Sequence, residues 1–346
     1  TGSLTDINNV LAAETAPTMT IADNFVSVVV TGTIDAADAQ SLTTDARIGS
    51  GVVTATVTGD QADDLNAALT NTALDVLSLT VLEDTVATDA ADLLALVDKT
   101  AGTIDVSNVT AIQGTVAELT AAAGVYGKAD IVGLGDEAIT ENSGGAISVA
   151  NANALAALTT GVVTASLSGT ASTLSSLNGT GNAYTLTVSD EAVAIDIADL
   201  LALNAATTVS VNVAAIDNSH GLSGTYSEIK ALFAAAAEGE FTGLAANLPI
   251  SVDDTSISVS QANEINALTS GAVTATISTG DMATLNTLEG SGNVYAVTVT
   301  DTSATASDLL ALDGKTTSSV NATAVTTLTG SLTDINNVLA AETAPT

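Results

Sequence analysis

Gly51–Gly59 reads GVVTATVTG, Gly161–Gly169 reads GVVTASLSG and Gly271–Thr279 reads GAVTATIST. These three stretches recur at a constant interval, and each alternates small apolar residues with Thr or Ser. In the first stretch the apolar residues occupy every second position from Val53 to Val57. A period of two in a β-branched run predicts a strand with one buried face.

The pattern changes after Gly59, where Ala62, Leu65 and Leu69 follow the three-to-four spacing of a short amphipathic helix. The sequence therefore predicts a strand followed by a helix. The starts of other helices are marked by a Ser or Thr and an acidic residue three positions later, which is the pattern of a capping box. These pairs are Thr115 with Glu118, Thr225 with Glu228, Ser3 with Asp6, and Ser331 with Asp334.

A longer repeat encloses the shorter one, because Thr1–Thr18 and Thr329–Thr346 both read TGSLTDINNVLAAETAPT. The motif ADLLAL at Ala91 and at Ala198 returns as SDLLAL at Ser307. Each block of about 110 residues holds four helix signals, so the elementary coil has about 27 residues. We expect one continuous array over residues 1–346, with four-coil blocks at about 1–50 (partial), 51–160, 161–270 and 271–346 (partial).

Strands joined by crossover helices pair in parallel and connect with right-handed crossovers. The sequence therefore predicts an α/β fold, a right-handed strand-helix solenoid with one long parallel sheet. It contains no polar capping repeat, and the stretch that ends at Thr346 can be continued as the stretch that ends at Thr18 is. We expect such coils to stack end to end, with lateral contacts from the longer fourth coil of each block.

The charge and residue composition exclude several classes of binding partner. The formal charge is −34, from 39 acidic residues against five basic ones, so phosphate backbones and anionic lipid surfaces are repelled. We therefore expect no nucleic acid partner. No apolar run approaches the roughly 18 to 20 residues of a membrane span, so we expect no membrane insertion. The chain contains no Cys, which excludes disulfides and thiolate metal sites.

Catalytic residues are not expected. The single histidine, His220, lies in the turn-like stretch NSHG. The carboxylate pairs have the residue types for acid-base chemistry, but we interpret them as solvated turns. They are Asp63 with Asp64, Asp136 with Glu137, and Asp253 with Asp254. The sequence thus predicts a protein that is not an enzyme and requires no cofactor.

Calcium is the candidate ligand, because acidic residues recur after strands at Asp84, Asp190 and Asp301. Carboxylates at equivalent turns are suitable Ca²⁺ ligands. The alternative for an Asp before a helix is an N-terminal cap. The Thr-x-Thr pairs of the strands, such as Thr54 with Thr56, raise ice binding as a further alternative to ordinary β-propensity.

The stretch Asp308–Thr317, DLLALDGKTT, is followed by SSVNATAVTTLTGSLTDINNVLAA. These residues resemble the large repetitive cell-surface and extracellular proteins of marine cyanobacteria and related bacteria, and the resemblance covers most of the chain. It implies export, a bacterial cell-surface or extracellular location and a very large parent chain, and it carries over no catalytic residue.

We accordingly expect a structural module of a filament, surface layer or adhesin stalk whose partners are copies of itself. The alternative is a ligand-binding solenoid for calcium or, ranked behind it, for ice.

Overall fold

The computed structural model describes residues 1–15, 27–70, 74–83, 85–120, 122–189, 192–217 and 219–343. It has the expected α/β class, with parallel strands and short helices in alternation. The chain divides into two compact units. The first comprises Thr1–Ser166 and Asn182–Tyr184, and the second comprises Leu167–Gly181 and Thr185–Thr346.

In the first unit the strands form two sets of parallel pairs. One sheet has the order β1-β2-β3-β5-β7, and β4, β6, β8 and β9 pair in that order in the other. The strands of the first sheet are Ser27–Ile34, Val52–Val57, Val76–Thr80, Ile104–Asp105 and Ile131–Val132. Those of the second are Thr88–Asp89, Ala111–Gly114, Ala138–Glu141 and Val163–Gly169.

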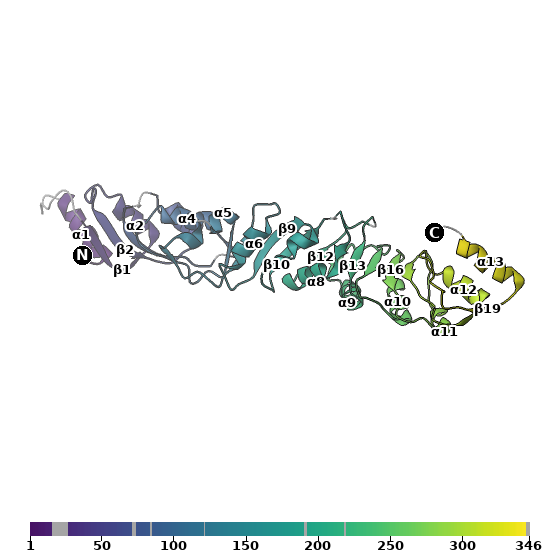
Figure 1. Cartoon of the computed structure of the whole chain (residues 1–346). Coiled ribbons are helices and arrows are strands. Elements are labelled where there is room, and N and C mark those ends of the chain that lie inside the picture. The colour runs from purple at the N-terminus through teal and green to yellow at the C-terminus, as the bar shows by residue number, and fades with distance from the viewer. Residues whose placement is uncertain are drawn as a thin grey trace. The chain divides into compact units, whose positions relative to one another are not determined.

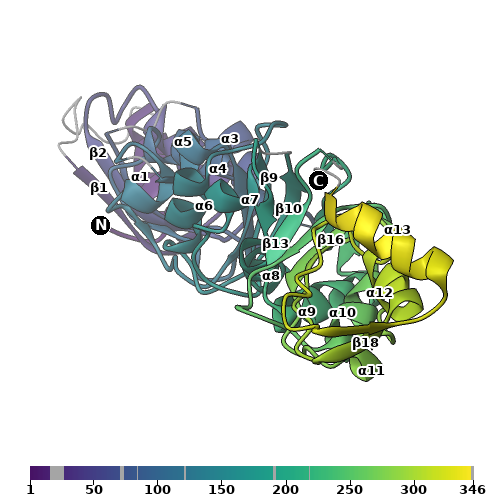
Figure 2. The same cartoon turned by 45° about the vertical axis from the view of Figure 1, so that its right-hand side comes forward.

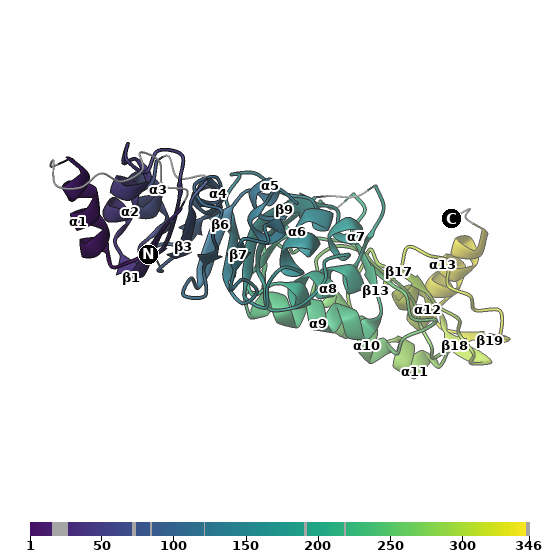
Figure 3. The ribbon, with the colours of Figure 1, turned by 90° about the vertical axis from the view of Figure 1, so that its left-hand side faces the viewer.

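The helices of this unit lie along one side of its strands (Figures 1 and 3), and each of α2 to α5 packs against the next helix in the chain. Their bounds are α1 Leu4–Thr15, α2 Ala36–Thr43, α3 Ala62–Ala68, α4 Ala90–Val97, α5 Val116–Thr120 and α6 Val149–Ala156, with a 3-10 turn at Val125–Gly127.

The second unit has the same construction. In it β10, β12 and β14 pair in order, β11-β13-β15-β16-β17 form a sheet, and β18 pairs with β19. The first three strands are Ala183–Val188, Val211–Asn212 and Phe241–Thr242. The next five are Ile195–Asp196, Leu222–Gly224, Ile250–Val252, Val273–Thr276 and Val294–Ala296, and the last two are Ser303–Thr305 and Thr327–Thr329.

Helices α8 to α11 lie in a row along one side of these strands (Figure 3), and α13 packs against α12. The bounds are α7 Ala171–Leu174, α8 Ile197–Ala206, α9 Tyr226–Ala237, α10 Val259–Asn266, α11 Met282–Leu285, α12 Ala306–Asp313 and α13 Leu332–Thr343. No helix within the described ranges is both long and apolar enough to cross a membrane.

The predicted alternation is confirmed in β2, where Val53, Ala55 and Val57 are buried. The core is built from Val, Leu, Ile and Ala, with Tyr184 and Tyr295 as its largest fully buried side chains. This follows from a sequence that is 46% hydrophobic but only 2% aromatic.

The predicted capping residues are also confirmed. Thr225 and Glu228 form a reciprocal capping box at the start of α9, and Thr115 and Glu118 make the same contacts before α5. The hydroxyl of Ser3 donates to Asp6 over 2.7 Å, and its oxygen accepts from the main-chain N–H of Asp6. Short helices are thus satisfied at their first turns, where main-chain N–H groups have no partner inside the helix.

The expectation of one long parallel sheet is wrong, because the strands divide among several sheets. The reason is that two strands, often very short, precede each helix in much of the chain. Ile104 pairs with Ile131 in one sheet of the first unit, while Ile112 pairs with Ile139 in the other. A two-residue strand such as β5 shows too little alternation to be recognised in the sequence.

Candidate functional site

The three predicted calcium ligands are not brought together by the described residues. Asp84 and Asp190 lie outside those residues. Asp301 is half-buried, and its Oδ2 accepts a hydrogen bond of 2.7 Å from the main-chain N–H of Met282 at the start of α11. Asp301 therefore contacts the start of α11, which precedes it in the chain, while the N-terminal cap of the following helix, α12, is Thr305. Across the described ranges no group of three or more His, Cys, Asp or Glu side chains gathers to hold a metal ion.

Carboxylates do gather near the start of α9, without forming such a group. Partial burial raises the pKa of Asp253, and the nearby carboxylates of Asp196, Glu228 and Asp254 raise it further. Asp254 accepts a hydrogen bond of 2.6 Å from the main-chain N–H of Tyr226. Each acid near a helix start stabilises that end of the helix, but the neighbouring carboxylates repel one another. The cost of this repulsion depends on ionic strength.

Glu137 corrects the expectation that the carboxylate pairs lie in solvated turns. Asp136 is exposed, as expected, but Glu137 is completely buried. Its carboxylate accepts a hydrogen bond of 2.9 Å from the Tyr126 hydroxyl and two from the main-chain N–H of Gly135. Burial, reinforced by this carboxylate, raises the pKa of Tyr126. These contacts tie neighbouring turns together and leave the carboxylate buried away from any substrate.

His220, by contrast, is exposed in a turn, as expected.

A polar contact recurs at one position of all three blocks. The main-chain N–H groups of Val53, Val163 and Val273 donate to the side chains of Asp75, Asn182 and Asn293, respectively, over 2.6, 3.0 and 2.8 Å. The three accepting side chains are buried. This contact supports the structure and has no feature of a reactive site.

The surfaces that stand out are those of the two identical terminal stretches. Residues 1–15 are called the first copy and residues 329–343 the second copy; their helices, α1 and α13, both read LTDINNVLAAET. Identical side chains have different environments in the two copies. Leu11 of the first copy is 2% exposed, and Leu339, its equivalent in the second copy, is 51% exposed. Val10 shows the opposite trend, since it is exposed while its equivalent, Val338, is half-buried.

The first copy is covered on the side of the segment that follows it. Gly2 forms a parallel bridge with Val30, and its N–H donates to the Val29 carbonyl over 3.1 Å. The guanidinium of Arg47 donates to the main-chain carbonyl of Leu11 and also pairs with Asp45. These contacts attach α1 to the docking segment, which we define as residues 27–48 and which contains β1 and α2.

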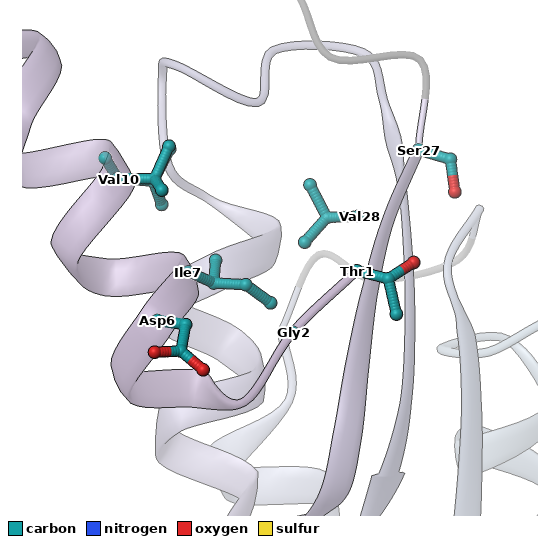
Figure 4. A pocket seen from close by; sticks show the side chains of 8 residues that line it. Thr1, Gly2, Asp6, Ile7, Val10, Ser27 and Val28 are labelled. Atoms are coloured by element: carbon teal, nitrogen blue, oxygen red, sulfur yellow. The ribbon is translucent and has the colours of Figure 1, made fainter. Parts of the chain in front are cut away.

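The space between the first copy and the docking segment is only partly filled. A cavity of about 150 Å³ lies between α1 and β1, and Ile7, Val10 and Val28 line it (Figure 4). The side chains of Ile7 and Val28 extend into the same space (Figure 4). This part of the core is apolar and only partly covered by the described residues.

The second copy is covered on the side of the segment that precedes it. Strand β19 pairs with β18, and α13 packs against α12 (Figure 2). A cavity of about 660 Å³ opens between the two helices, with Leu309, Leu328 and Leu339 in its lining. Leu332 is 76% exposed. Leu339 is therefore exposed within the partly open space between α13 and the coil that precedes it.

Helix α9 shows the same repeat position with a neighbour on each side. It packs against both α8 and α10. Ile229 and Leu232, which stand at the positions of Ile7 and Val10, are fully buried there. Among the described residues, each of the two copies therefore lacks, on one side, a neighbour that α9 has.

No family model, curated protein or solved structure matches the chain. The described residues provide a repeated strand-helix framework with partly open apolar spaces at its two terminal copies. The sequence marked the two copies through their identity. It did not mark Arg47, whose contact with Leu11 joins residues that are distant in the chain.

Proposed function

We propose that the chain is an extracellular structural repeat module that assembles end to end, and also laterally through its longer coils, into a filament, surface layer or adhesin stalk. In this proposal the whole chain is a right-handed strand-helix solenoid with coils of the length that the sequence repeat predicts. Each coil has two strands and one helix, in place of the single strand first expected.

The observation that carries the proposal is the position of helix α9, which packs against α8 on one side and α10 on the other. Its residues Ile229 and Leu232 are fully buried, and Phe233, which stands at the position of Leu11 and Leu339, is half-buried. Each coil therefore presents two complementary faces to its neighbours. Heterologous contacts of this kind repeat without closing and produce linear assemblies.

The spacing of paired strands supports the solenoid. Besides the two isoleucine pairs of the first unit, Leu222 pairs with Ile250 and Val211 pairs with Phe241. Each pair joins residues about one proposed coil apart. In a solenoid every coil contacts only its neighbours, so the array can be extended without a new kind of interface.

The extracellular, bacterial location rests on the resemblance to large repetitive surface proteins and on the charge of −34. A high net negative charge keeps an apolar-rich chain soluble while leaving short-range docking of its ends intact.

Negative-stain electron microscopy combined with sedimentation velocity tests the proposal. We expect the weight-average mass of the purified chain to rise with concentration, and micrographs to show uniform fibres or lattices. A chain that stays monomeric up to millimolar concentration, at low and at high salt, contradicts the proposal.

The described residues give less support to a ligand-binding solenoid. Asp301 already accepts a helix-terminal hydrogen bond. Thr54 pairs across the sheet with Val29 and Val76, which interrupts a row of hydroxyls at that position, whereas Thr56 pairs with Thr33 and Ser78.

A further inference from the structure

The turn between α7 and β10 contains Asn178 and Gly179, the sole Asn-Gly pair of the sequence. We propose that this pair is a site of spontaneous covalent modification. The side-chain amide of Asn178 cyclises onto the main-chain nitrogen of Gly179, and the residue is converted to an aspartate or an isoaspartate. This reaction is independent of self-association.

The reaction needs only water. The main-chain nitrogen of Gly179 gives up its proton to a base in the solvent and attacks the amide carbon Cγ of Asn178. The bond from Cγ to Nδ2 breaks, and the nitrogen leaves as ammonia. Water then opens the cyclic imide at either of its carbonyl carbons and leaves a carboxylate, so nothing is oxidised or reduced. Because the attacking nitrogen belongs to the next residue, the reaction has the advantage of an intramolecular step.

The reacting groups are accessible. Asn178 and Gly179 are both exposed and lie outside the helices and strands. Gly179 has a φ of +80°, and the lack of a Cβ atom lets the chain take up other conformations there at small cost. Its N–H makes no hydrogen bond to a described residue, so the nitrogen can turn toward the amide without breaking one.

Other exposed asparagines differ in this respect. The N–H of Ser143, which follows the exposed Asn142, donates to Oε1 of Glu141 over 3.1 Å. Hydrogen bonds to main-chain carbonyl groups likewise hold the nitrogens that follow Asn108, Asn212 and Asn286. The fold therefore restrains the attacking nitrogen at these positions and leaves it available at Gly179.

The third block shows that this turn accepts a carboxylate. Residues 177–184 read LNGTGNAY and residues 288–295 read LEGSGNVY, so Glu289 stands where Asn178 does. The backbone takes the same form in both turns, because φ is +80° at Gly179 and at Gly290. The aspartate product is therefore compatible with the fold, and it adds a negative charge at neutral pH.

Deamidation rates of the full chain, measured site by site in the folded state and in denaturant, test this inference. Incubation at mildly alkaline pH is followed by digestion with pepsin in acid and by mass spectrometry of the peptides. We expect Asn178 to react at a similar rate in both states. Asn142 should react several-fold more slowly in the folded chain than in denaturant. Isoelectric focusing should show the corresponding acidic shift of the whole protein.

Two variants are matched controls. Asn178→Gln keeps the amide but would have to form a larger ring, so most of the acidic shift should be lost. Glu141→Ala removes the acceptor of the Ser143 N–H, and it should speed the reaction at Asn142 several-fold without changing that at Asn178. Far-UV circular dichroism verifies that both variants are folded.

Two results overturn the inference. One is an Asn178 that reacts many-fold more slowly in the folded chain than in denaturant. The other is a folded chain in which Asn142 reacts as fast as Asn178. Neither result bears on the proposed function, which is tested by the association of the wild-type chain.

Discussion

The main-chain N–H of Val53 lies 2.6 Å from the carboxylate of Asp75, a side chain that is only 6% exposed. Asn182 and Asn293 accept the same bond in the other two blocks. An amide oxygen therefore serves equally well at this position. Burial raises the pKa of Asp75 above its ordinary value of 3.8, which shows that the charge is a cost to the folded state.

The first prediction is that Asp75→Asn stabilises the protein at neutral pH by about 1 kcal/mol, because the acceptor is kept and the buried charge is lost. An acid with a raised pKa binds its proton more tightly in the folded state. Its contribution to stability is thus fully present below pH 3.8 and is lost as the pH rises through the raised pKa.

The melting temperature of Asp75→Asn should therefore exceed that of the wild type at pH 7, and the two should converge in acid. Asp63→Asn removes the same charge from an exposed side chain and serves as the control, with an expected change within about 0.5 kcal/mol. A destabilised Asp75→Asn variant at pH 7 would contradict the argument.

The second prediction concerns Tyr295, whose buried hydroxyl has no hydrogen-bond partner among the described residues. Burial raises its pKa to about 12. Tyr295→Phe removes an unsatisfied polar group without leaving a large cavity, so we expect stabilisation of about 1 kcal/mol in chemical denaturation. Tyr184→Phe, at the equivalent position, is the comparison. That hydroxyl lies 3.5 Å from the Ala152 carbonyl, so its removal should bring no gain.

The third prediction concerns a glycine at the start of a repeated strand. A Cβ atom on Gly161 would lie 2.3 Å from the carbonyl oxygen of Glu137. Because that atom belongs to the backbone of a neighbouring segment, Gly161→Ala should destabilise the first unit by about 2 kcal/mol or more. Gly145→Ala, where a Cβ would meet nothing within 4 Å, should be neutral or slightly stabilising. Equal effects of the two substitutions would refute the steric explanation.

The fourth prediction is that stability increases with ionic strength. Carboxylates such as Asp196, Glu228 and Asp253 repel one another, and salt screens this repulsion. The melting temperature should rise steadily between about 0.05 and 1 M NaCl. A rise at millimolar Ca²⁺ that Mg²⁺ does not reproduce, and that Asp301→Asn reduces, would instead identify a specific calcium site.

Much of the secondary structure could be predicted, because its signals are local. The alternation at Val53 to Val57 and the pair Thr225 and Glu228 each indicate one element within a few residues. The number of sheets could not be predicted. Two-residue strands such as β5 and β7 are recognised by their pairing partners, since they are too short to show a sequence pattern.

The buried polar residues were missed for a related reason. Glu137 has the sequence surroundings of a turn, and its carboxylate is held by the hydroxyl of Tyr126, which lies well before it in the chain. The sequence identity of the two terminal copies could be recognised, but the different exposure of equivalent side chains such as Leu11 and Leu339 follows only from the structure.

The contact between Val53 and Asp75 has a consequence for how the chain reaches its native state. Adjacent strands in this protein are similar enough to slide past one another at little cost in apolar burial. A slip of two residues would keep the same apolar side chains on the buried face, but it would move Asp75 away from Val53 and leave the Val53 N–H buried without an acceptor. Such inward-facing polar groups therefore act as a check on alignment, one for each block, and penalise misfolded pairings that a purely aliphatic interior would tolerate.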